Sequence, residues 1–273
     1  MGKYSTTRKR SLRVLAVYGR GVRVAREVLE GAIFVSDVHH QEGLSHFPRL
    51  LNHLLASPPS QLFLMGDIFQ ILVGSVKSSY RPYISILEQL ELLSQKSTLF
   101  YFEGNHDFGL TQLSYLKNIQ FYPSKIQPIP FTCQHKLFLL AHGDLFLKWS
   151  YEIYIRLLSS QFSIKTLGFL DQIIPLYAPL TAPIYHKKIR SLIPNQEVFK
   201  DFSKQRLACY EHWRAKIAPT LNLGGVIEGH FHIGRFYKSD QNLLYAALPS
   251  FYHNQEICQY MGIKTGLQIR RLN

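Results

Sequence analysis

Five short fragments rich in Asp, His and Asn are spread along the chain, and each directly follows a short apolar run. They read Asp-Val-His at 37–39, Gly-Asp at 66–67, Gly-Asn-His-Asp at 104–107, His-Gly-Asp at 142–144 and Gly-His-Phe-His at 229–232. Together they offer seven oxygen and nitrogen donors: Asp37, His39, Asp67, Asn105, His142, His230 and His232. A mixed set without thiolates suits manganese, iron, zinc or cobalt better than a Cys-based structural zinc site. The fragments therefore predict a pair of divalent metal ions and metal-assisted phosphoester hydrolysis.

Two of these donors, Asp37 and His39, are two positions apart at a strand exit. Their side chains leave the chain on the same side and form a corner for one ion. Asp67 follows the next strand, and its two carboxylate oxygens can bridge two ions. Such ions, ~3.5–4 Å apart, lower the pKa of a bridging water and hold the phosphate oxygens during in-line displacement. We expect Asp67 to be the catalytic residue most sensitive to loss.

Three further side chains stand beside the donors. His106 follows the donor Asn105, and we expect it to bind a phosphate oxygen or to protonate the leaving oxygen. Asp107 is expected to orient its loop or the ring of His106. Asp144 is expected to hold the ring of His142 in place, as acids behind metal-binding imidazoles commonly do.

The apolar runs that precede the fragments have the length and composition of strands. They cover residues 32–35, 62–65, 99–102, 137–140 and 226–228. Between the first three of these strands, apolar residues from Phe47 to Leu55 have helical spacing, and a second helix is expected from about Pro82 to Gln95. An alternation of strands and helices predicts a parallel sheet. In such sheets, ligands bind at the carboxyl ends of the strands, which is where the fragments lie.

Three short runs near the C-terminus alternate with turn residues, and we expect them to be antiparallel strands that close a second sheet. These runs are 235–237, 243–246 and 266–269. The predicted fold is α/β, with two sheets packed face to face and helices outside. Residues 1–30 would form a basic N-terminal extension and 31–273 one domain. Within that domain, a helical insertion at about 145–217 would cover the site as a cap.

The charge of the chain favours anionic partners. Formal net charge is +13 and the pI is near 9.6, which fits phosphorylated metabolites, acidic membrane surfaces or nucleic acid. The first 26 residues contain basic side chains and no acid, as expected of a solvated tail or a surface-binding arm. No run of ~18 apolar residues is free of polar breaks, so no membrane span is expected.

In this order, the five fragments resemble the calcineurin-like metallophosphoesterase superfamily. Its pattern is Asp-x-His, Gly-Asp, Gly-Asn-His-Asp/Glu, His and Gly-His-x-His, and the resemblance covers about Ile33 to Leu248. It implies a two-sheet metallophosphoesterase sandwich with αββα layers and a dinuclear metal centre. By that resemblance, one metal would be held by Asp37, His39, Asp67 and His232. The other would be held by Asp67, Asn105, His142 and His230.

The basic, apolar insertion is similar to that of the UDP-2,3-diacylglucosamine pyrophosphatases of lipid A biosynthesis. The best-known branch of those enzymes has Arg at the position of His106. The similarity implies a manganese-dependent hydrolase that is cytoplasmic and peripherally associated with the inner membrane, whose acidic surface would be a partner. Its substrate would be a nucleotide-linked lipid, cleaved to UMP and 2,3-diacylglucosamine 1-phosphate. Aromatic side chains of the insertion either line a groove for the acyl chains or pack its helices onto the domain.

Lys187, Lys188 and Arg190 in the insertion either contact substrate phosphates or acidic headgroups, or form an ordinary solvated face. The alternative function is a nuclease or cyclic-nucleotide phosphodiesterase on the same scaffold. Net charge supports it, but much of that charge lies in the N-terminal extension, so nucleic acid is the less favoured partner. A protein that kept the fold and lost the chemistry would lack metal ligands, and none is missing.

Overall fold

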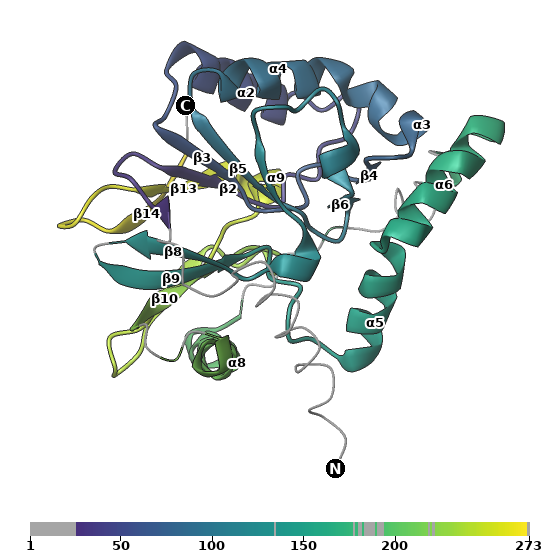
Figure 1. Ribbon diagram of the computed structural model, residues 1–273. Coiled ribbons are helices and arrows are strands. Elements are labelled where there is room, and N and C mark those ends of the chain that lie inside the picture. Colours follow the sequence, from purple (N-terminus) through teal and green to yellow (C-terminus); the bar gives the residue numbers. More distant parts are fainter. Residues whose placement is uncertain are drawn as a thin grey trace.

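The computed structural model describes residues 26–133, 135–176, 194–217 and 222–271, with the single residues 178, 179, 182, 189 and 219 (Figure 1). Most of the basic extension, together with Lys187, Lys188 and Arg190, lies outside the described residues. What was expected of them from the sequence stays a prediction.

The first sheet holds the strands that deliver the first three fragments. Its order is β14-β13-β2-β3-β5-β7, with β2, β3, β5 and β7 parallel. Its strands are β2 (Ile33–Val35), β3 (Gln61–Leu64), β5 (Thr98–Phe102), β7 (Gln120–Tyr122), β13 (Glu256–Tyr260) and β14 (Leu267–Arg271). The predicted strands at 32–35, 62–65 and 99–102 are thereby confirmed, and they are adjacent and in the expected direction.

The second sheet delivers the last two fragments. Its order is β1-β8-β9-β10-β12-β11. Its strands are β1 (Arg26–Glu27), β8 (Ile129–Cys133), β9 (Lys136–Ala141), β10 (Leu223–Glu228), β11 (Arg235–Lys238) and β12 (Leu244–Ala247). β9, β10 and β12 are mutually parallel in this order, so their carboxyl ends share one edge.

The expected pairing of the C-terminal strands was partly wrong. β11 and β12 are antiparallel to each other, but β12 joins the second sheet in parallel beside β10. β14 instead pairs with β13 at the edge of the first sheet, next to β2. Short alternating runs predict strands, but they carry no information on which distant strand each will pair with.

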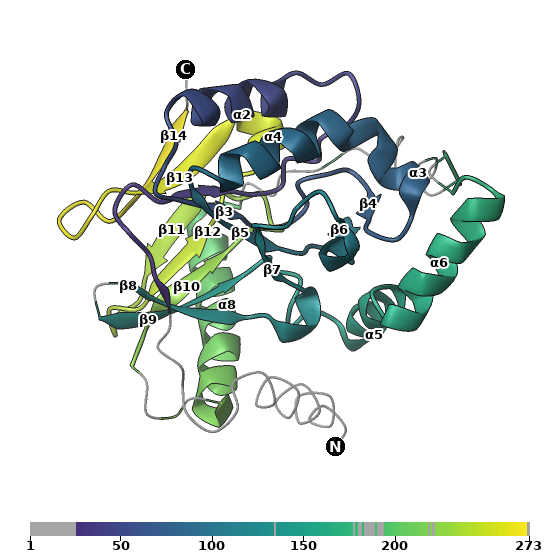
Figure 2. The same cartoon turned by 45° about the horizontal axis from the view of Figure 1, so that its top comes forward.

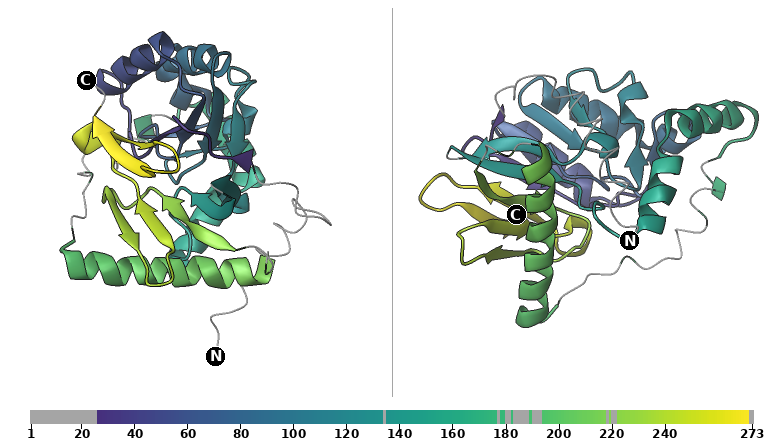
Figure 3. Two further views of the ribbon diagram at one scale, coloured as in Figure 1. Left: turned by 90° about the vertical axis from the view of Figure 1, so that its left-hand side faces the viewer. Right: turned by 60° about the horizontal axis from the view of Figure 1, so that its bottom comes forward.

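Helices cover the outer faces of both sheets. α2 (His46–Ala56) and α4 (Ile84–Ser94) lie on the first sheet, and α8 (Gln196–Ile217) lies along the second (Figures 1 and 3). α2 buries Phe47, Leu50, Leu51 and Leu54, whose helical spacing gives it one apolar face. Two layers of sheet between two layers of helix make the predicted αββα sandwich.

The interior between the sheets contains a cluster of stacked and edge-on aromatic rings. Phe34 and Phe63 stack with ring centroids 4.5 Å apart, and Phe63 and Phe100 stack at 4.7 Å. Phe131 from the second sheet meets Phe63 and Phe100 edge-on at 5.2 Å each. Such pairs bury large areas and prefer offset or edge-to-face contact. The contacts of Phe131 with Phe63 and Phe100 pack the two sheets against each other.

The chain between the fourth and fifth fragments contains three described helices with different surroundings. α8 packs on the second sheet through Phe199, Leu207, Tyr210 and Trp213, so it is a layer of the sandwich. α5 (Trp149–Leu158) and α6 (Gln161–Ile173) project beside α3 (Lys77–Tyr80), β4 (Leu72–Val73) and β6 (Asp107–Phe108), as Figure 2 shows. How far a separate cap extends within 145–217 stays a prediction.

Short elements complete the chain: the 3-10 turns Arg81–Tyr83, Leu110–Gln112 and Ser124–Ile126, and the helical turn α9 (Phe251–Asn254). Within the described ranges, no helix combines the length and apolar character needed to cross a membrane.

Candidate metal centre

The carboxyl ends of β2, β3, β5, β9 and β10 bring the seven expected donors to one place. A first group contains Asp37, His39 and His232, whose donor atoms all lie within 4.8 Å of one another. Asp37 Oδ1 is 3.2 Å from His232 Nε2, and the Nε2 atoms of His39 and His232 are 3.4 Å apart. β2 supplies one side of this group, and the loop after β10 supplies the other.

A second group contains Asp67, His142 and His230. His142 Nε2 lies 3.2 Å from His230 Nδ1 and 3.3 Å from Asn105 Oδ1, which adds the amide oxygen. Asp67 Oδ2 is 3.6 Å from the same His142 nitrogen. A third group that could hold a metal joins His39, Asp67 and His106. Which ion each donor holds stays a prediction from the family resemblance.

Asp67 stands between the two groups. Its Oδ2 is 3.6 Å from His142 Nε2 in one group and 4.0 Å from His39 Nε2 in the other. Its other oxygen, Oδ1, accepts a hydrogen bond from the backbone N–H of His106 at 2.9 Å. This is the position expected of a bridging carboxylate.

The donor set fits divalent metal ions. Ligands bound at about 2.1 Å around one ion lie roughly 3.0–3.4 Å apart, and the pairs of donor atoms given above are 3.2–4.0 Å apart. Asp37 Oδ1 is buried and lies 3.2 Å from His232 Nε2, while its second oxygen accepts a hydrogen bond from His230 N at 2.9 Å. A buried carboxylate oxygen that faces an imidazole nitrogen at this distance is suited to sharing a cation with it.

Burial keeps two of the imidazoles neutral and therefore able to bind a metal. It lowers the pKa of His39 to about 4, against the opposing charge of Asp67. Burial and the neighbouring His142 lower the pKa of His230 to about 3. The pKa of His142 behaves differently: burial lowers it, but Asp67, Asp144 and Asp37 raise it to about 9. A metal ion binding at His142 must therefore displace a proton.

The backbone at the donors is held in an uncommon conformation. Five of the seven donors have positive φ: 51° at Asp37, 44° at His39, 53° at Asp67, 67° at His230 and 56° at His232. Left-handed backbone at residues with side chains costs on the order of 1 kcal/mol or more each, and it persists only where surrounding structure fixes it. Such strain turns successive side chains of one loop toward a common point.

Glycine is required where the backbones cross at the centre. A Cβ on Gly104 would collide with Asp67 Oδ1, and one on Gly229 would collide with Ser36 Oγ. Ser36 itself donates to Asp37 Oδ2, so the second collision would reach a metal-binding side chain. The glycines within the fragments therefore permit the close approach of three loops.

Asp107, which was expected to orient its loop or the ring of His106, binds backbone N–H groups of two loops. Its carboxylate accepts hydrogen bonds from the N–H groups of Asp67 at 3.0 Å, Ile68 at 2.6 Å and Gly104 at 2.9 Å. Tyr101 Oη adds a bond at 2.7 Å. Burial and the charge of Asp67 raise the pKa of Asp107 to about 6. It ties the Gly-Asp loop to the Gly-Asn-His-Asp loop.

The ring of His142 is oriented by the carbonyl of Met65. Nδ1 of His142 lies 2.9 Å from that oxygen and donates to it, which directs Nε2 to the other donors. Asp144, which was expected to hold this ring, is buried and helps to raise the pKa of His142 by its charge. The hydrogen-bond partner of Nδ1 is thus a backbone group that side-chain patterns do not reveal.

His106 lies at the rim of the centre. Its ring centroid is 5.0 Å from that of His39, and its Nδ1 is 2.7 Å from the carbonyl oxygen of Gln70. Since a carbonyl only accepts, Nδ1 carries the proton of this hydrogen bond and Nε2 is the atom left to meet a substrate.

Two residues important for the centre were missed in the sequence. Arg206 of α8 forms a buried ion pair with Glu228, two positions before His230, and also donates to the carbonyls of Gly143 and Leu145. A carboxylate inside an apolar strand could have marked Glu228 as a buried partner. Arg206 has no comparable local signal, because basic residues are common on that helix.

A third missed residue is Tyr151 of α5. Its ring centroid lies 6.4 Å from that of His230, and its hydroxyl is buried without a hydrogen-bond partner among the described residues. Burial and the charges of Asp144 and Asp67 raise its pKa. The sequence predicted only packing or an apolar groove for this aromatic ring.

The family model for calcineurin-like phosphoesterases matches residues 32–234, which is most of the chain. The chain belongs to this family, and it is a metal-dependent phosphoester hydrolase with residues placed for divalent metals. Among solved structures, it is similar to the phosphoesterase YfcE from E. coli, at 14% sequence identity over 89% of this chain and 93% of that chain, with a TM-score of 0.42. A search of curated proteins finds no match.

Proposed function

We propose that this hydrolase cleaves the diphosphate of UDP-2,3-diacylglucosamine, releasing UMP and 2,3-diacylglucosamine 1-phosphate in lipid A biosynthesis, with manganese as its metal. Such a substrate joins an anionic diphosphate to apolar acyl chains. The observation that carries the proposal is a pair of adjoining helices that expose apolar side chains, the first of which reaches the metal centre through Tyr151.

α5 has two different faces. Tyr151 and Ile155, four residues apart, are turned inward, and Tyr151 approaches His230. Trp149, Ile153 and Leu157, also spaced by four, are exposed by 74%, 38% and 64%. Residues four apart share a helix face, so this helix shows one side to the metal centre and an apolar stripe to its surroundings.

α6 also has a buried side and an exposed apolar side, but its buried side packs on α3, β4 and β6. Ile164 and Asp171 are buried, and Asp171 accepts a hydrogen bond from the backbone N–H of Ser78 at 2.8 Å, which fixes the helix to α3. Phe162, Phe169 and Ile173 are exposed by 80%, 62% and 64%. Several large apolar side chains exposed on two adjoining helices of a folded protein indicate a lipid, membrane or protein contact. They support acyl-chain binding next to the metals.

Exposed cations accompany this surface. Lys148, Arg156 and Lys165 lie on or directly before the two helices and are exposed. Apolar side chains beside Lys and Arg are typical of surfaces that bind the headgroup region of acidic membranes. This supports peripheral association with the inner membrane from the cytoplasm. Contacts of Lys187, Lys188 and Arg190 with phosphates or headgroups belong to the same proposal.

The residues of the centre have separate tasks in the hydrolysis. Divalent ions, when bound, lower the pKa of a water molecule and neutralise phosphate charge. Asp37, His39 and His232 would hold one ion, while Asn105, His142 and His230 would hold the other, with Asp67 shared. Because Nδ1–H of His106 is donated to the carbonyl of Gln70, Nε2 can donate only when both ring nitrogens carry a proton. In that form Nε2–H would bind a phosphate oxygen or protonate the oxygen that leaves with the sugar phosphate.

The direct test is to incubate the purified protein with Mn²⁺ and UDP-2,3-diacylglucosamine in detergent and to measure UMP by ion-exchange chromatography. Release of UMP is expected. A Trp149→Ser, Leu157→Ser, Phe162→Ser variant should raise KM for this lipid and leave the hydrolysis of bis(p-nitrophenyl) phosphate unchanged. Ile263→Ser with Leu92→Ser is the matched control, because both side chains are exposed apolar residues on other elements.

A different outcome would favour the alternative function. Hydrolysis of bis(p-nitrophenyl) phosphate without any UMP release would reject the lipid substrate. Cleavage of single-stranded DNA, RNA or a cyclic nucleotide in the same assay would then assign a nuclease or cyclic-nucleotide phosphodiesterase. Nucleic-acid binding that weakens steeply with salt would support that assignment.

A further inference from the structure

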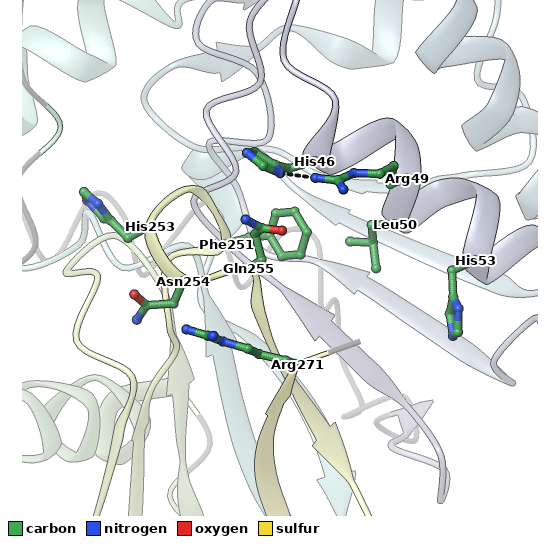
Figure 4. Close-up of a pocket in the computed structure, with 9 residues that line it drawn as sticks. All are labelled: His46, Arg49, Leu50, His53, Phe251, His253, Asn254, Gln255 and Arg271. Atoms are coloured by element: carbon green, nitrogen blue, oxygen red, sulfur yellow. Dashed lines mark hydrogen bonds between the residues drawn. The ribbon is translucent and has the colours of Figure 1, made fainter. Parts of the chain in front are cut away.

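A pocket of about 550 Å³ opens between α2, α9 and β14 (Figure 4). Its floor is formed by Leu50 and Phe251, which are only 5% and 4% exposed and belong to the core of the first sheet. A floor built from the core is preorganised, because its side chains are already fixed by packing. The pocket has the size and the partly apolar lining of a site for an organic molecule.

The walls carry hydrogen-bond donors. His46, Arg49 and His53 come from one side of α2, where their spacing of three and four residues aligns them. Arg271 comes from β14 and His253 from α9. None of the lining residues is acidic, so two guanidinium groups face the pocket without a carboxylate among its walls.

The two arginines are available to a ligand. Nη2 of Arg49 lies 2.6 Å from Nδ1 of His46, and since a guanidinium only donates, Nδ1 accepts and Nε2 of His46 carries a further N–H. Arg271 Nε is 3.9 Å from Glu256 Oε1, a long separation, and its side chain is 66% exposed. Both groups therefore keep donors for anionic oxygens.

The pocket adjoins the metal centre. The ring centroid of His253 lies 5.7 Å from that of His232. α9 is also tied to β2, because Phe251 N donates to Ser36 O at 3.0 Å and Ser250 Oγ donates to Asp37 O at 2.9 Å. α5 meets the centre beside His230, whereas this basic pocket meets it beside His232.

We propose that this pocket binds the nucleotide end of the substrate, a phosphate ester of nucleoside monophosphate size. The proposal rests on the proposed function in that it assumes a substrate with an anionic end and an apolar end. Guanidinium and imidazole N–H groups donate to phosphate oxygens and equally to the carbonyl oxygens of a nucleobase. The apolar floor accommodates the remainder of the ligand.

The test uses the manganese-loaded full chain and its hydrolysis of bis(p-nitrophenyl) phosphate, with UMP as inhibitor. An Arg49→Gln, Arg271→Gln variant should raise the inhibition constant of UMP about tenfold, as expected for the loss of charge-assisted hydrogen bonds. Arg270→Gln is the matched control: Arg270 is exposed on the same strand, donates to Gln259 and does not line the pocket. Its inhibition constant should equal that of the wild type.

Inorganic phosphate separates the pocket from the metals, because it is small enough to bind at the metals alone. Its inhibition constant should be unchanged in the double variant. Equal inhibition by UMP in the wild type and the double variant would overturn the proposal, as would a parallel weakening of inorganic phosphate. The reporter substrate contains neither nucleotide nor lipid, so a failure of UDP-2,3-diacylglucosamine as substrate would not change how these results are interpreted.

Discussion

Arg206 and Glu228 form a two-point ion pair in which Nε and Nη2 of the guanidinium each lie 2.7 Å from one carboxylate oxygen. Glu228 is also the acceptor for the hydroxyls of Tyr210 and Tyr245. Burial lowers the pKa of Arg206, but the charge of Glu228 outweighs burial, so the pKa of Arg206 lies well above its usual value. Through this pair, α8 holds the end of β10 from which the His230 loop departs.

Replacing Arg206 by Met should destabilise the fold by about 3–5 kcal/mol, because it leaves the carboxylate of Glu228 buried without its counter-charge. Urea unfolding at equilibrium measures this free energy. Lys204→Met, at an exposed position of the same helix, is the control and should change the stability by less than about 0.5 kcal/mol. A loss of under about 1 kcal/mol for Arg206→Met would show that the ion pair does not hold α8.

Asp67→Asn should lower the metal content and the activity together. The amide keeps the size of the side chain and one oxygen, but it removes the negative charge shared by the two donor groups. Metal analysis by mass spectrometry and the kcat for bis(p-nitrophenyl) phosphate check this. Asp240→Asn, at an exposed turn, is the control. A variant that retains the metal content of the wild type would contradict the bridging role of Asp67.

The donors of the metal centre could be predicted from the sequence because each follows a short buried strand. Strand composition and the shared edge of parallel strands are local and general rules, and together they place Asp37, Asp67 and Asn105 side by side. The aromatic contacts between the sheets were not predicted, yet they join the sheet that delivers Asp67 to the sheet that delivers His142.

The features that could not be predicted are contacts between residues far apart in the sequence. β12 pairs with β10, and β14 pairs with β13. The sequence of a short strand does not indicate which other strand it will pair with. The same holds for Met65, whose carbonyl orients His142, and for Arg206, which looks like any basic residue of an amphipathic helix. The basic pocket is lined by residues of α2, α9 and β14. Because these residues lie as far apart in the sequence as 46 and 271, they form no local motif that could have been recognised.

The role of His106 can be separated into leaving-group protonation and phosphate binding. If it protonates the leaving oxygen, His106→Gln should lower kcat by roughly 10²–10⁴-fold for a poor leaving group such as an alkyl phosphate. For p-nitrophenolate, which needs no proton to depart, the loss should be much smaller. Comparing kcat for both leaving groups checks this. An equal loss for both would assign His106 to phosphate binding instead.

Tyr151→Phe should lower activity while increasing stability. The hydroxyl is buried without a partner in the described chain, so its removal should raise the free energy of unfolding by about 1 kcal/mol. Because the ring of Tyr151 packs beside His230, we expect a substrate bound at the centre to accept a hydrogen bond from this hydroxyl, and its loss should then reduce kcat/KM for the lipid substrate about tenfold. Tyr154→Phe, on the exposed side of α5, is the control. Unchanged kinetics in Tyr151→Phe would limit this residue to packing.

Glu103 should make the stability fall as the pH rises. Burial raises the pKa of Glu103 from 4.5 to about 7, although the backbone N–H of Leu110 donates to its carboxylate at 2.8 Å. Between these two values the folded protein holds a proton that the unfolded chain has lost, so stability decreases with pH in that window and levels off above it. From pH 5.5 to 8 the contribution of this group should decrease by about 2 kcal/mol.

Glu103→Gln removes this titration, so the free energy of unfolding of the variant minus that of the wild type should rise by the same amount between pH 5.5 and 8. Urea unfolding at both pH values measures the difference, and contributions from all other groups cancel in it. Glu42→Gln, at an exposed position, should show no such change. Parallel stability curves for Glu103→Gln and the wild type would mean that Glu103 is charged in the folded protein throughout this range. In that case the free-energy cost of burying the charged carboxylate of Glu103, two residues before Asn105, would have to be offset by another group of the metal centre.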